Sequence, residues 1–97
     1  MDQHEETQLI EEQEILSKLL GVHDKNLKLI KSDFNANILL HDNEIKIIGD
    51  KKTVETVSDI IKNVIKEIKS ENDISEQKIA YYIEMGKNSA DLDYSEL

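Results

Sequence analysis

The stretch NILLHDNEIKIIGDKKTVETVSDIIKNVIKEIK, residues 37–69, decides the fold. It begins with two apolar runs, Asn37–His41 and Glu44–Ile48, which are joined by Asp42-Asn43. Both joining residues tolerate positive φ, so the pattern predicts a tight β-hairpin. From Thr53 to Lys69 the apolar residues recur three and four positions apart, which predicts a long amphipathic helix.

Shorter patterned segments precede the hairpin. Met1–Glu6 is polar and is expected to be loose, whereas Thr7–Ile10 is a candidate short strand. The apolar spacing in Glu11–Leu20 predicts a helix that ends at Gly21. A second short helix is expected from Lys25 to about Asp33, with Asp24 as its N-cap.

Capping signals place the remaining helix ends. Gly49-Asp50 should close the second strand of the hairpin and cap the long helix. Ser75 should cap a last helix, with Ile74 packing on its first turns, and Gly86 is expected to end it.

The predicted order is a weak strand, two helices, two strands, the long helix and one further C-terminal helix. Because a hairpin alone is marginal in water, the helices must cover one face of a small antiparallel sheet. The fold class is therefore α+β.

Length and charge define the organisation of the chain. Ninety-seven residues suffice for one small domain, which we place at residues 9–86, between a loose acidic start (residues 1–8) and an acidic tail or linker (residues 87–97). The net charge of −9 is concentrated in the flanks: residues 1–14 carry −6 and residues 70–97 carry −5, whereas residues 15–69 carry +2. The nearly neutral middle contains the periodic segments.

Composition excludes several classes of function. The chain has no cysteine, and all 12 of its basic residues are lysine, so disulfides, thiolate metal sites and arginine chemistry are absent. It has no long apolar run, so we expect no membrane span, no signal peptide and a cytoplasmic location without membrane contact. With no G-x-x-x-x-G-K-[ST] motif and no nucleophile pattern, we expect no catalytic residue, no metal and no bound cofactor. His4 and His41 are expected to be surface residues.

The segment from Gly21 to Lys31 has features that favour phosphate binding. A glycine-started loop that leads into a helix directs backbone N–H groups and the positive end of the helix dipole outward, which favours phosphate. Lysines at positions 25 and 28 add charge there, and Lys18 could reach in from the preceding helix. The alternative is a plain corner between two helices with a solvated lysine face. The candidate RNA- or phosphate-binding residues are Gly21, Val22, His23, Asp24, Lys25, Asn26 and Lys28.

Adjacent tyrosines, Tyr81 and Tyr82, form the other candidate contact for bases. Neighbouring residues on a helix point about 100° apart, so we expect one ring to pack and the other to be exposed.

Four segments of the sequence, in this order along the chain, resemble a known family. Leu19–Ile30 reads LLGVHDKNLKLI and Asn43–Asp50 reads NEIKIIGD, followed by Val54–Ile61 and the helix start at Asp73–Ile79. Together these blocks, within Leu9 to Gly86, resemble the N-terminal domain of PhoH-like ATPases. The resemblance implies a cytoplasmic P-loop ATPase linked to RNA metabolism, whose ATP and Mg²⁺ belong to a module that follows such a domain.

The same stretch is similar to a KH RNA-binding module in the order of its elements. The G-x-x-G loop of that module would fall on Gly21-Val22-His23-Asp24, where Asp24 replaces the second glycine. This carboxylate, the missing arginines and the net charge favour protein contact over RNA.

Two functions are expected from these observations. The first is a non-catalytic accessory domain of a PhoH-like ATPase, which contacts its own ATPase module or another subunit, or presents nucleic acid weakly. The second is a KH-like single-stranded RNA-binding domain that uses the Gly21–Asp24 loop and the neighbouring lysines.

Overall fold

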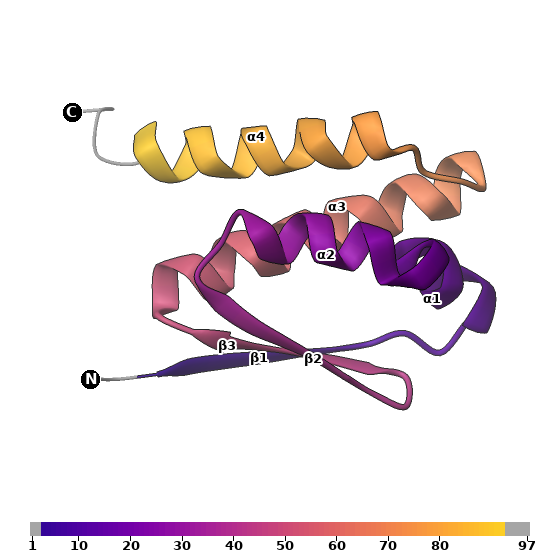
Figure 1. The fold of residues 1–97 in the computed structure, drawn as a ribbon, viewed down its shortest axis with the longest axis horizontal. Coiled ribbons are helices and arrows are strands. Elements are labelled where there is room, and N and C mark those ends of the chain that lie inside the picture. The colour runs from indigo at the N-terminus through magenta and orange to yellow at the C-terminus, as the bar shows by residue number, and fades with distance from the viewer. Residues whose placement is uncertain (1–2, 93–97) are drawn as a thin grey trace.

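A computed structural model describes residues 3–92, which form a three-stranded sheet and four α-helices (Figure 1). In chain order these are β1 (His4–Leu9), α1 (Gln13–Leu20), α2 (Lys25–Ser32), β2 (Ala36–His41), β3 (Glu44–Gly49), α3 (Lys51–Glu71) and α4 (Glu76–Leu92). A short 3-10 turn, Val22–Asp24, connects α1 to α2. The predicted α+β class and the predicted element order are confirmed.

The sheet is antiparallel throughout, with β3 between β1 and β2. The β2–β3 hairpin pairs His41 with Glu44 across a two-residue loop in which Asp42 has a φ of 56°. The predicted hairpin is therefore confirmed. Its alternation directs Ile45 and Ile47 of β3 into the core, where neither side chain is exposed.

All the helices lie on one side of this sheet (Figure 1). The helix α3 contacts β1, β3, α1 and α4, and α4 forms a further layer over α2 and α3. As predicted, the apolar stripe of α3 faces the core, and its members are at most 3% exposed: Val54, Val57, Ile60, Ile61, Val64 and Ile68. No helix within residues 3–92 is both long and apolar enough to span a bilayer.

The N-terminal strand corrects the expectation that Met1–Glu6 is loose. Strand β1 starts at His4, so Glu5 and Glu6 pair with Ile48 and Ile47 of β3. The prediction failed because the inward-facing positions of β1 are polar and give no apolar alternation. Residues 1–2 lie outside the described part of the chain.

Ser58 of α3 satisfies these inward polar groups. Its hydroxyl donates to Glu6 Oε1 (2.9 Å), and Gln8 Nε2 donates to both the backbone oxygen and Oγ of Ser58 (3.0 and 3.1 Å). Ser58 is only 1% exposed, so this network ties β1 to α3 inside the fold.

The last helix corrects a second expectation. Helix α4 starts as predicted, with Ser75 Oγ accepting from the backbone N–H of Lys78 (3.1 Å), but it continues through Gly86 to Leu92. A Cβ at position 86 would lie 2.9 Å from Ile60 Cδ1, so glycine allows α4 to approach α3 closely. Residues 87–92, expected to be tail, are helical, and residues 93–97 lie outside the described part.

We predict that Ser58→Ala lowers the free energy of unfolding by about 1 kcal/mol, because two buried side-chain hydrogen bonds are lost. Ser70→Ala, on the exposed end of the same helix, is the matched control and should change stability by less than about 0.5 kcal/mol. Urea denaturation measures both. Equal effects would mean that the buried network does not stabilise β1.

The cap of α3 generates a prediction on pH. Asp50 accepts from the Thr53 backbone N–H (2.9 Å) and from Thr53 Oγ1 (3.0 Å), and these bonds lower the pKa of Asp50 below its ordinary value of 3.8. A lowered folded-state pKa stabilises the protein above the unfolded pKa, and this stabilisation is lost as the pH falls through the folded pKa.

We expect the Tm difference between wild type and Asp50→Asn to be larger at about pH 7 than at about pH 3, because asparagine keeps an acceptor that does not titrate. Calorimetric melts over this range measure the difference. A difference that does not change with pH would contradict the role of the ionised cap.

Candidate functional site

The corner between α1 and α2 contains all seven residues that the sequence marks for RNA or phosphate. Gly21 ends α1 with φ +78°, a conformation that L side chains rarely adopt. A Cβ at position 21 would also lie 2.8 Å from the Asn26 side chain. The glycine of this loop is therefore required by backbone conformation and by close packing.

Contrary to the prediction, the side chain of Asp24 does not cap α2. Its φ is 59°, in the left-handed region rather than the extended region of an ordinary N-cap, and its side chain accepts no capping hydrogen bond. His23 before it is also left-handed, with a φ of 55°. The carboxylate of Asp24 is exposed at the loop surface.

The loop uses some of its backbone donors internally. The N–H of Asp24 donates to the oxygen of Gly21 (3.1 Å), and the N–H of Lys25 donates to the oxygen of Val22. These bonds form the 3-10 turn. Two of the N–H groups expected to point at a phosphate are therefore already bonded within the turn.

Asn26 is buried between the two helices. It is 8% exposed, and its Nδ2 donates to the backbone oxygen of Lys18 at the end of α1 (3.1 Å). This bond and the contact with Gly21 fix the angle of the corner. In this arrangement Asn26 is a structural residue rather than a surface contact.

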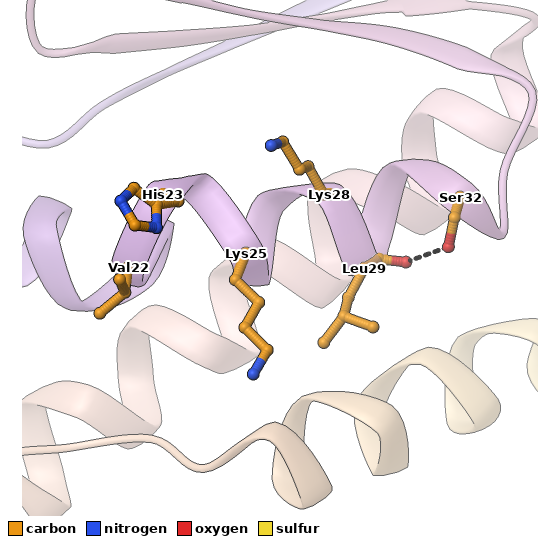
Figure 2. A pocket seen from close by; sticks show the side chains of 6 residues that line it. All are labelled: Val22, His23, Lys25, Lys28, Leu29 and Ser32. Carbon is orange, nitrogen blue, oxygen red and sulfur yellow. Dashed lines mark hydrogen bonds between the residues drawn. The ribbon is translucent and has the colours of Figure 1, made fainter.

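The lysines do not converge on the loop. Lys25 forms an ion pair with Glu76 at the start of α4. Lys18 donates to the backbone oxygen of Asn72 (2.6 Å) at the end of α3, and lies 3.5 Å from Glu14. Figure 2 shows Lys28 extending from α2 on the side opposite Lys25. Sequence reasoning missed Glu76 and the backbone oxygen of Asn72 because they lie at the start of α4 and the end of α3, about 50 residues away.

An open groove of about 570 Å³ borders this corner (Figure 2). Its lining residues are Val22, His23, Lys25, Lys28, Leu29 and Ser32. Val22 is 75% exposed, so the groove combines an apolar rim with one lysine that has no ion-pair partner among residues 3–92, Lys28. Such a surface can hold a partner by contact, but it offers no nucleophile paired with a base.

The two tyrosines of α4 separate as predicted. Tyr81 is 54% exposed, with the Lys78 ammonium 5.4 Å from its ring centre. Tyr82 is half-buried and donates to Glu67 Oε1 (2.9 Å). Burial and this carboxylate raise the pKa of Tyr82. Of these two rings, Tyr81 is therefore the one open to a partner.

The side chains that could ligate a metal do not cluster in the described part of the chain. Across residues 3–92, no three His, Asp or Glu side chains gather as a metal site requires. His23 and His41 lie on the exposed surface, and His41 Nδ1 is 3.3 Å from Asp42 Oδ2.

One curated relative is similar to most of the chain. It is a PhoH-like protein of Bacillus subtilis (strain 168), 32% identical over 78 residues, which are 80% of this chain and 24% of the relative. The chain therefore spans about a quarter of the length of the relative it matches. No family model and no solved structure matches the chain. The similarity supports a PhoH-related domain.

Asp24 yields a prediction that separates its charge from its role in the fold. Asp24→Gly should fold with unchanged stability, because no capping bond is lost and glycine tolerates φ 59°. It should tighten binding of a labelled single-stranded RNA about three- to tenfold, because a negative charge beside the phosphates is removed.

Fluorescence anisotropy measures the gain, and two lysine variants test its origin. Adding Lys28→Ala should cancel it, whereas Lys25→Ala should reduce it less, since Lys25 is paired with Glu76. If the double variant Asp24→Gly, Lys28→Ala still binds RNA more tightly than wild type, Lys28 does not contact the phosphates.

Proposed function

We propose that the chain is a non-catalytic accessory domain of a PhoH-like P-loop ATPase, which acts by contacting the ATPase module or another subunit. The observation that carries this proposal is the internal use of the groups that would otherwise bind a phosphate. Lys25, Asn26 and two loop N–H groups all have partners within the fold.

The similarity to a PhoH-like protein supports the setting of this domain. The matched stretch is domain-sized within a relative about four times as long. ATP and Mg²⁺ would be held by the ATPase module, because the three glycines of this chain lie far apart and none belongs to a G-x-x-x-x-G-K-[ST] motif. A cytoplasmic setting and a link to RNA metabolism are part of the same proposal.

A KH-like single-stranded RNA-binding function is the second candidate. Two observations favour it: the β-α-α-β-β-α order with a glycine-started loop between α1 and α2, and Lys28 at the groove, which has no ion-pair partner within the described residues. Against it stand the exposed Asp24 carboxylate and the net charge of −9.

The test compares the two partners directly. Calorimetric titration of the chain into the full-length Bacillus subtilis PhoH-like protein should give micromolar binding, whereas binding to single-stranded RNA should be no tighter than about 100 μM at physiological salt. The chain alone should neither bind ATP·Mg²⁺ with micromolar affinity nor hydrolyse it.

Two outcomes would change the conclusion. Micromolar, sequence-selective RNA binding without protein binding would establish the KH-like function instead. Stoichiometric binding of ATP·Mg²⁺ by the chain alone would overturn the non-catalytic assignment.

A further inference from the structure

The two edges of the sheet differ in charge. The sheet order leaves β1 and β2 as the outer strands. Strand β1 carries Glu5 and Glu6, and charged residues protect an edge strand from pairing with another chain. By contrast, Ala36–Leu40 of β2 has no charged residue, and Leu39 and Leu40 are 52% and 42% exposed.

The backbone of β2 offers hydrogen-bonding groups at this edge. The two-residue loop makes His41 and Glu44 a hydrogen-bonded pair. Backbone groups alternate along a strand, so Leu39 also bonds to β3, whereas Ile38 and Leu40 direct their N–H and C=O groups away from the sheet. Strand β2 pairs with β3 alone among the described strands.

We propose that β2 is the interface between two copies of this chain, paired antiparallel about a two-fold axis at Leu39. In this register Leu39 lies opposite Leu39 of the other copy, on the sheet face away from the helices. Ile38 lies opposite Leu40 and exchanges two backbone hydrogen bonds with it. The two sheets join into one of six strands. This inference rests on the proposed function and assigns one of its protein contacts.

Charge supports a second copy as the partner. A chain with a net charge of −9 repels itself, except where the facing surfaces carry no like charge. Ala36–Leu40 is such a surface. At each end of the seam the antiparallel register brings Asp42 of one copy to the same end as the last turn of α2 of the other, which carries Lys31. The carboxylate that follows this turn, Asp33, lies 3.9 Å from Lys87 of its own chain. The two-fold axis makes the two ends of the seam equivalent, so each end combines Asp42 of one copy with Lys31 of the other, and these two charges are of opposite sign.

Sedimentation velocity on the chain alone measures this dimer. The sedimentation coefficient should rise with protein concentration, and Leu39→Lys should weaken dimerisation at least about tenfold, because two like charges then face each other directly. Leu9→Lys is the matched control: Leu9 is 59% exposed on the same sheet face, but on the β1 side. It should leave dimerisation unchanged, and circular dichroism should show both variants folded.

Cross-linking tests the register. Residues opposite each other in a non-hydrogen-bonded antiparallel pair have Cα atoms about 4.5 Å apart, which suits a disulfide. Because the chain has no native cysteine, Leu39→Cys should form a covalent dimer under mild oxidation, and Leu9→Cys should not.

Three outcomes would overturn the proposal: a monomer at every concentration, equal weakening by Leu39→Lys and Leu9→Lys, or equal cross-linking of the two cysteine variants. If the chain is a monomer and Leu39→Lys instead weakens binding to the PhoH-like protein, the edge belongs to that partner. Dimerisation is measured on the chain alone. A result that excludes the dimer therefore does not exclude contact with the ATPase module, which the calorimetric titration tests separately.

Discussion

The burial of one helix face against one sheet face holds this fold together. Helix α3 places its apolar stripe against β1 and β3, and it also contacts α1 and α4. Complete burial of a valine or isoleucine side chain stabilises a protein by about 1.5–3 kcal/mol. The stripe has six such residues, so it contributes more than any polar contact of the chain. The loop between α1 and α2 is positioned through this packing.

Elements with a clear apolar period were predictable from the sequence. The hairpin and α3 were found because Ile45 and Ile47 alternate with polar residues, and because Val54 and Val57 begin a helical stripe. Strand β1 was found only in part, because hydrogen bonds to Ser58 replace apolar burial on its inner side. Gly86 was misassigned because a glycine that ends a helix and a glycine that allows close helix packing look alike in sequence.

The residues of the candidate site lie together in one corner of the fold, but their chemistry depends on distant partners. The sequence identifies Gly21 and the lysines of α2. It gives no sign that Glu76 of α4 pairs with Lys25, or that Asn72 binds Lys18. Ion pairs between helices depend on tertiary packing, which local patterns do not encode. The final helix therefore alters the surface of α2: Lys87 lies 3.9 Å from Asp33, so α4 is tied to α2 at both ends.

The hydrogen bonds between Gln8 and Ser58 have a consequence for synthesis of the chain. The two residues are 50 positions apart, so β1 leaves the ribosome long before its partner in α3 exists. The central strand β3, which pairs with β1, is also made more than 30 residues later. An apolar strand in that position would expose an aggregation-prone segment until β3 and α3 are made. The inward-facing positions of β1 are polar, so they can stay hydrated until β3 and then α3 have been made.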